Sequence, residues 1–128
     1  PLYSSAASDV YKRQVLDRVS PRMAVGREEI FGPVLSVSYA NTLEEAIRQA
    51  NAVPYGNMAC IFTTSGKAAR EFRERVQAGM VGVNVGVAQP FAFYPFSGWK
   101  NSFFGDLHPH GPDAFLFYTQ RKVVVERW

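Results

Sequence analysis

The chain has few of the side chains that most often do chemistry in proteins. In 128 residues it has one cysteine, Cys60, and two histidines, His108 and His110. One cysteine cannot form a disulfide within the chain, which excludes a small fold held together by several disulfides. Long apolar runs are missing too, since no stretch reaches the roughly 18 residues that a membrane-spanning helix needs. We therefore expect a reducing setting and no membrane partner.

An excess of one charge is also missing. The sequence sets 14 lysines and arginines against 11 aspartates and glutamates, a net charge of +3, and the two signs alternate along the chain. A surface that binds DNA or RNA needs a concentrated basic patch or stripe, so we expect no nucleic-acid partner. The chain is instead rich in hydrophobic residues, at 47%, which is enough for one domain with a modest core.

The first 14 residues, PLYSSAASDVYKRQ, show no sustained periodicity and are rich in serine and alanine. Such a segment buries too little apolar surface to offset the entropy lost on ordering it. The chain opens on Pro1 rather than on methionine, and the run resembles translated adaptor sequence. We therefore predict that residues 1–14 are a disordered tail of foreign origin and that the chain is a fragment. A native flexible linker is the alternative for this tail.

Residues 34–50 predict a strand followed by a helix. In VLSVSY, apolar and small polar residues alternate, which is typical of a strand with one less buried face. Thr42 and Glu45 then form the T-x-x-E capping box that opens many helices. The apolar positions of this helix recur at helical spacing and predict one buried stripe, made of Leu43, Ala46, Ile47 and Ala50.

Residues 58–84 repeat this alternation. The apolar run MACIFTT predicts a buried strand, Ser65 opens a second helix, and Gly79 is expected to punctuate its end. The run MVGVNV predicts a third strand, in which Gly82 indicates the close approach of another backbone or a ligand. Strands separated by helices pair in parallel. We therefore predict an α/β fold with a small parallel β-α-β-α-β sheet, as part of a domain that spans residues 15–114.

Beyond this sheet the chain enters a long loop, rich in glycine and proline, that carries seven aromatic residues: Phe91, Phe93, Tyr94, Phe96, Trp99, Phe103 and Phe104. Loops this long are usually functional or disordered, and so much apolar surface needs a partner, either the sheet or another segment. The last residues, 115–128, contain three consecutive valines flanked by charges, Val123, Val124 and Val125. They predict an edge strand able to pair with another subunit.

Three candidate reactive groups are set aside on chemical grounds. Cys60 lies within an apolar strand without a histidine, lysine or helix N-terminus near it to activate the thiol, so we predict a buried, inert cysteine. His108 and His110 lack the cysteine or acidic partners of a tetrahedral site, so we predict no metal. The glycines of GMVGVNVG match neither of the common phosphate-binding motifs.

The pair Glu28 and Glu29, in REEIFGPVLSV, stands directly ahead of a predicted strand. A surface carboxylate is usually only solvated. An ionised carboxylate nevertheless has two acceptor oxygens, which suits two adjacent sugar hydroxyls, and the ring of Phe31 is placed to pack beside a flat heterocycle. Dinucleotide-binding folds pair a carboxylate with a ribose in this way. Gly32 and Pro33 would then fix the turn between this site and the strand.

Five segments, in order, resemble the C-terminal part of the NAD-dependent aldehyde dehydrogenases: EEIFGPVLSV, YGNMACIFT, GMVGVNVGV, PFSGWKNSFFGDLH and YTQRKVVVERW. The aromatic loop is most similar to the methylmalonate-semialdehyde dehydrogenase branch, which transfers its acyl group to coenzyme A. The resemblance implies oxidation of methylmalonate or malonate semialdehyde with NAD through a cysteine thioester. It also implies a cytoplasmic enzyme, or one of the mitochondrial matrix in a eukaryote. Coenzyme A and water both stay open as the acyl acceptor.

The resemblance further implies a role for residues near the cofactor. Glu29 matches the family's glutamate that accepts hydrogen bonds from the nicotinamide ribose, and Phe31 matches the phenylalanine that packs near the nicotinamide. Glu28 matches no functional position. Asn84 matches a position that braces loops around the active site.

The same resemblance places part of the aldehyde tunnel in the aromatic loop. Phe96 matches the aromatic residue that lines the tunnel, and Phe91 and Phe93 would lie along or beside that wall. Ser97 and Asn101 depart from the pattern, since this branch commonly has glycines there, and each adds a side chain to the loop.

No catalytic residue is matched within this chain. By the resemblance, the nucleophilic cysteine, the general-base glutamate, the oxyanion-hole asparagine and the Rossmann cofactor domain belong to upstream sequence, and Cys60 does not align with the nucleophile. We therefore expect the chain to be inactive alone. Residues 115–128 resemble the arm that assembles the family's homotetramer. A free-standing α/β interaction or assembly module, without catalysis, is the alternative of a different class.

Overall fold

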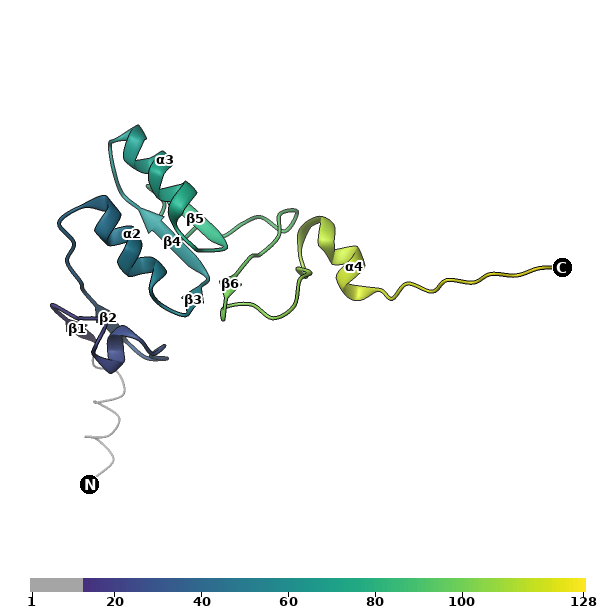
Figure 1. The fold of residues 1–128 in the computed structure, drawn as a ribbon, viewed down its shortest axis with the longest axis horizontal. Helices are drawn as coiled ribbons and strands as arrows, with labels where there is room; N and C mark the ends of the chain where they lie inside the picture. The colour runs from purple at the N-terminus through teal and green to yellow at the C-terminus, as the bar shows by residue number, and fades with distance from the viewer. Residues whose placement is uncertain (1–12) are drawn as a thin grey trace, which may run out of the picture. The chain divides into compact units, whose positions relative to one another are not determined.

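The structure, a computed structural model, describes residues 13–128 and divides the chain into two compact units, Pro1–Val53 and Pro54–Trp128 (Figure 1). Most of the predicted N-terminal tail lies outside the described residues. Its last residue, Gln14, already belongs to a strand. None of the described helices is long and apolar enough to cross a membrane.

The first unit contains a short parallel pair of strands that the sequence patterns did not predict. Strand β1 (Gln14–Leu16) pairs in parallel with β2 (Val34–Ser36), so β2 is shorter than the predicted strand 34–39. The 3-10 turn η1 (Ala24–Gly26) lies between them. The pairing continues loosely beyond the strands, because the Val19 N–H donates to the Val37 carbonyl at 2.9 Å.

Helix α2 (Leu43–Asn51) begins where the capping box predicts. The Thr42 hydroxyl accepts the Glu45 N–H at 3.1 Å, which satisfies one of the free amides at the helix N-terminus. The reciprocal bond of the box is displaced by one residue, since the Glu45 carboxylate accepts the Asn41 N–H at 2.9 Å. The predicted apolar stripe is only partly right: Ile47 is 2% exposed and Leu43 half-buried, while Ala46 and Ala50 are exposed.

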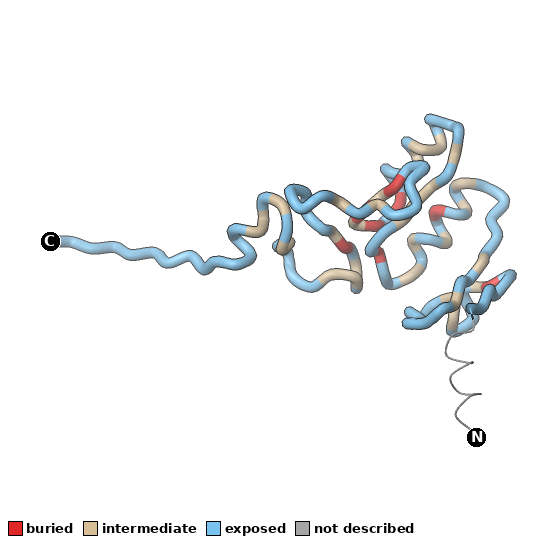
Figure 2. The backbone as a smooth tube through the Cα atoms, turned by 180° about the vertical axis from the view of Figure 1, so that it is seen from behind, coloured by how far each residue is buried: buried red, intermediate tan, exposed pale blue. Residues whose placement is uncertain are grey.

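The second unit contains a β-α-β element that follows the sequence closely. Strands β4 (Met58–Ile61) and β5 (Met80–Val83) pair in parallel, with Met58 opposite Met80 and Ile61 opposite Val83, and α3 (Gly66–Arg75) connects them. The Ser65 hydroxyl caps α3 by accepting the Ala68 N–H at 3.2 Å. Figure 2 marks the buried residues in this element, which include Phe72, Val76, Ala78 and Met80.

The predicted three-stranded parallel sheet is wrong for the described residues. Strand β2 pairs with β1 and not with β4, and β3 (Tyr55–Gly56) pairs antiparallel with β6 (Trp99–Lys100), so the described residues form three separate two-stranded sheets. Alternation of strand and helix predicts parallel pairing but not which strand edges meet. Here β2 pairs with β1, and the sequence pattern of residues 14–16 did not predict that β1 is a strand.

The predicted end of the second helix is also corrected. Helix α3 ends at Arg75, with Val76 in an extended conformation, so Gly79 does not cap it. Gly79 instead lies directly before β5, where the backbone of Ser97 passes close to it. A Cβ added at Gly79 would lie 2.6 Å from the carbonyl of Ser97. Gly82 behaves as predicted, because a Cβ there would lie 2.9 Å from the Val85 carbonyl oxygen and from the Cys60 sulfur.

Residues 115–128, predicted as a strand that pairs with another subunit, form no strand within this single chain, and the pairing with another subunit stays a prediction. The 3-10 turn η2 (Gly111–Asp113) leads into the short helix α4 (Ala114–Tyr118), and residues 119–128 follow without regular structure, as the yellow trace in Figure 1 shows. Every residue from 119 onward is exposed. The pattern of valines favours a strand, but within the described chain no other strand edge pairs with them.

Candidate functional site

Glu29, the carboxylate of the candidate cofactor site, lies in the first unit between η1 and β2, next to Glu28. The Glu28 N–H donates to the Ala24 carbonyl at 2.8 Å, which ties this end of the segment to η1. The Glu29 side chain is exposed, and the structure of residues 13–128 gives its carboxylate no hydrogen-bond partner. Within residues 13–128, no side chain or backbone group therefore occupies the two oxygens of Glu29.

The turn that follows presents an aromatic ring to solvent. The Gly32 N–H donates to the Ile30 carbonyl at 2.9 Å, and the Val34 N–H donates to the Gly32 carbonyl at 2.8 Å, so two tight turns lead into β2. Phe31 stands at the centre of the first turn and is 94% exposed. The Phe31 ring is therefore accessible to a ligand or partner.

The aromatic residues predicted to line the aldehyde tunnel lie in the second unit. Phe91 and Phe93 are 75% and 66% exposed, and their rings stack with centroids 5.7 Å apart. The Tyr94 ring lies 4.8 Å from that of Phe93. Phe96, the residue matched to the tunnel wall, is partly exposed and does not join this stack. The structure thus brings two of the three candidates together.

Asn84 fastens the end of β5 to the loop after β4. Its side-chain oxygen accepts the Thr63 N–H at 2.8 Å, and its side-chain amide donates to the Thr63 carbonyl at 3.0 Å. The residue has a φ of +56°, a conformation that asparagine tolerates better than most residues. This bidentate contact fixes where the chain leaves the sheet and the aromatic loop begins.

Two sulfur atoms of β4 hold the first residues of that loop. The Ala88 N–H donates to the Met58 sulfur at 3.1 Å, and the Cys60 sulfur lies 3.7 Å from the Gly86 carbonyl oxygen. Cys60 is half-buried rather than buried as predicted. Its described contacts are structural, because they join β4 to the loop.

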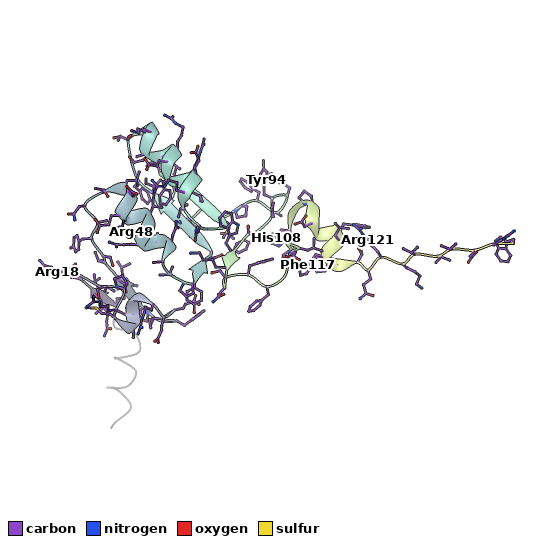
Figure 3. The ribbon with its side chains drawn as sticks, in the orientation of Figure 1. Arg18, Arg48, Tyr94, His108, Phe117 and Arg121 are labelled. Carbon is purple, nitrogen blue, oxygen red and sulfur yellow. The ribbon has the colours of Figure 1, made fainter. Side chains whose placement is uncertain are left out.

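His108, which the sequence analysis set aside as a metal ligand, pairs with an aspartate five residues further along the chain. His108 Nδ1 lies 3.1 Å from Asp113 Oδ2, and the His108 ring stacks on Phe103 at 4.4 Å between centroids. Figure 3 labels His108 and Tyr94 on the loop region between β5 and α4. Among the described residues no group of three or more histidine, cysteine, aspartate or glutamate side chains is placed to hold a metal ion.

One titratable group is shifted in the first unit. The Tyr39 hydroxyl donates to the Asp17 carboxylate at 2.8 Å, and this hydrogen bond raises the pKa of Tyr39 above its ordinary value because ionisation would lose the bond. The contact joins the segments that follow β1 and β2. We assign it a structural role.

Comparison with known proteins identifies the class. The aldehyde dehydrogenase family model matches residues 5–124, so the chain belongs to the aldehyde dehydrogenase family. This confirms the resemblance seen in the five sequence segments. The mixed helices and strands agree with part of the aldehyde dehydrogenase fold.

Individual relatives point to one branch. The chain is 54% identical over 114 residues to malonate-semialdehyde dehydrogenase 2 of Geobacillus kaustophilus and to the malonate-semialdehyde dehydrogenase of Pseudomonas aeruginosa. Each match covers 89% of this chain, but only 24% and 23% of these relatives. The chain thus spans about a quarter of the length of the curated relatives it matches.

Solved structures with high similarity to this chain come from the same branch of the family. The methylmalonate-semialdehyde dehydrogenase of Oceanimonas doudoroffii superposes with a TM-score of 0.80 at 51% identity. A protein from Sinorhizobium meliloti assigned as a methylmalonate-semialdehyde dehydrogenase, in complex with NAD, superposes with a TM-score of 0.81 at 47% identity. Both superpositions cover 89% of this chain and 23% of the other.

Proposed function

We propose that the chain acts as the C-terminal part of an NAD-dependent aldehyde dehydrogenase that oxidises malonate or methylmalonate semialdehyde to an acyl-CoA. The observation that carries the proposal is the identity of 51–54% to malonate-semialdehyde dehydrogenases over 89% of the chain. Two methylmalonate-semialdehyde dehydrogenase structures with TM-scores of 0.80 and 0.81 support it.

The residues of the first unit fit the cofactor that such an enzyme needs. Glu29 has an exposed carboxylate with two acceptor oxygens, which suits the two hydroxyls of the nicotinamide ribose. The exposed face of Phe31 suits a flat nicotinamide ring. When bound, NAD supplies the acceptor for a hydride. Glu29 and Phe31 would orient the nicotinamide, because a small misplacement of reacting atoms costs much of the rate.

The residues of the second unit fit the aldehyde side of the site. The stacked rings of Phe91 and Phe93, together with Phe96, offer an apolar wall for the carbon chain of an aldehyde. The nucleophilic thiolate, which would form the thioester passed on to coenzyme A, comes from another part of the protein, since Cys60 is committed to β4 and its loop. The chain therefore contributes positioning rather than bond-making.

The proposal also covers assembly and location. Val123, Val124, Val125 and Trp128 are all largely exposed, which suits a strand that pairs with another copy of the enzyme. We propose a homotetramer assembled through residues 115–128. The location would be the cytoplasm, or the mitochondrial matrix in a eukaryote. The alternative, a free-standing interaction module, would use the same exposed side chains to bind a different protein.

A chimera tests the proposal. The 114 matched residues would replace the corresponding stretch of malonate-semialdehyde dehydrogenase 2 from Geobacillus kaustophilus, which the chain resembles at 54% identity. We expect NADH formation with malonate semialdehyde and coenzyme A, and an acyl-CoA product rather than the free acid. Co-expression of the chain with the truncated relative is a second format. A folded chimera that makes no NADH with any aldehyde contradicts the proposal and favours the interaction module.

A further inference from the structure

The five residues at the turn of the aromatic loop, Phe91 to Pro95, form what we call the aromatic tip. The tip has little support of its own: the Tyr94 N–H donates to the Phe91 carbonyl at 2.9 Å, and the rings of Phe91, Phe93 and Tyr94 contact one another. All three rings are mostly exposed, so burial does not hold them in place.

A second segment, far along the loop, holds the backbone of the tip. The Gly111 N–H donates to the Ala92 carbonyl at 3.1 Å. Gly111 has a φ of +73°, and a Cβ there would lie 2.8 Å from the Pro95 nitrogen and 2.9 Å from the Tyr94 carbonyl carbon. Two separate reasons thus require glycine at position 111: its positive φ, and the closeness of the tip backbone, which leaves no room for a Cβ.

The turn that carries Gly111 is itself closed by side chains. His108 Nδ1 lies 3.1 Å from Asp113 Oδ2, so the pair spans the turn with Gly111 between its members. The His108 side chain is 18% exposed and stacks on Phe103 with an interplanar angle of 19°. A hydrogen bond and a ring contact therefore fix His108 from two directions, which limits where Gly111 can lie.

We propose that the turn from His108 to Asp113 is a brace that positions the aromatic tip and thereby sets how the enzyme selects its aldehyde. Gly111 and His108 are positioning residues in this scheme, because they act on the backbone at Ala92 and Tyr94. That backbone carries the rings of Phe91, Phe93 and Tyr94. The inference rests on the proposed function, which assigns Phe91 and Phe93 to the aldehyde route.

Gly111→Ala in the chimera is the first test, with Gly105→Ala as its matched control. Gly105 has a φ of +81°, and a Cβ there would meet nothing within 4 Å, so alanine at Gly105 strains the backbone without touching the tip. We expect Gly111→Ala to raise the KM for malonate semialdehyde about tenfold while the KM for NAD stays within about twofold. Gly105→Ala should leave both constants close to those of the parent chimera.

A pair of substitutions at His108 separates the hydrogen bond from the ring contact. His108→Asn keeps a polar group able to bond to Asp113 but loses the stack on Phe103, whereas His108→Phe keeps the stack and loses the bond. If the bond closes the brace, His108→Phe raises the aldehyde KM and His108→Asn largely restores it. Hydrogen exchange gives a second readout: the Tyr94 amide, protected by Phe91, should exchange faster in Gly111→Ala and His108→Phe.

The outcomes divide cleanly. An aldehyde KM that rises alone, with faster exchange at Tyr94, supports the brace. Equal losses in the KM values for aldehyde and NAD, or no difference between Gly111→Ala and Gly105→Ala, overturn it. If Gly111→Ala does not fold, the two His108 variants decide the matter. An unsubstituted chimera without activity defeats the proposed function instead, whereas an active chimera whose variants all match it defeats only the brace.

Discussion

Two regions of the second unit differ in what holds them. The β4-α3-β5 element uses contacts within the chain: parallel strand pairing, a serine cap on α3, and buried side chains such as Phe72 and Val76. The aromatic loop is held by a few backbone and side-chain contacts, and most of its rings are exposed, as are those of the C-terminal residues. The β4-α3-β5 element is therefore stabilised by contacts within the chain, whereas the aromatic loop and the C-terminal residues leave apolar surface available to a ligand or another protein segment.

Phe72→Ala should give the largest effect, and Phe93→Ala is its matched contrast. Phe72 is 8% exposed, so removing its ring should leave a cavity and cost roughly 3–5 kcal/mol of stability. Phe93, an equally large ring, is mostly exposed, and its loss should cost stability within about 0.5 kcal/mol while changing the aldehyde KM. Urea unfolding of the chimera measures the first quantity. Similar losses of unfolding free energy for Phe72→Ala and Phe93→Ala would contradict the difference between the two regions.

Glu29→Gln sharpens the comparison at an exposed position in the first unit. Because Glu29 has no described partner, the substitution should leave stability unchanged yet slow hydride transfer about 100-fold, more than it weakens NAD binding. Single-turnover formation of NADH is the measurement. The neighbouring Glu28→Gln is the control, since it makes the same chemical change beside the site. Equal effects at the two positions would remove Glu29 from the cofactor site.

Asn84→Ala tests the junction between the two regions. It removes two hydrogen bonds to Thr63 and puts alanine at a φ of +56°, so we expect a loss of about 1–2 kcal/mol together with a raised aldehyde KM. Asn84→Asp keeps the acceptor for the Thr63 N–H and should lose about half as much. Loss of stability without any change in aldehyde KM would make Asn84 a support of the sheet alone.

Thr42→Ala should give the smallest effect, about 1 kcal/mol, because it removes the cap from α2 and nothing else. Thr42→Ser keeps the hydroxyl and should restore most of the stability. Thermal unfolding of the chimera compares the two, and NAD and aldehyde constants should stay unchanged. A change in either constant would show that the local helix cap also influences the site.

Local signals in the sequence were reliable where one or two neighbouring residues decide the structure. Thr42 and Ser65 marked the starts of α2 and α3, and Gly82 marked a close backbone approach. The predictions failed where a distant segment decided. Gly79 looked like a helix end but serves the close passage of the backbone at Ser97, 18 residues further along the chain.

The sequence by itself determined the starts of α2 and α3, the parallel β4-α3-β5 element and, through its motifs, the aldehyde dehydrogenase family, because each depends on residues close together in the chain. Only the tertiary structure decided that β2 pairs with β1, that the valines after α4 form no strand within the described residues, and that Gly111 lies against the aromatic tip. These outcomes depend on which distant backbone edges meet. Hydrophobic periodicity does not specify which strand edges pair, since one strand edge offers the same hydrogen bonds as another.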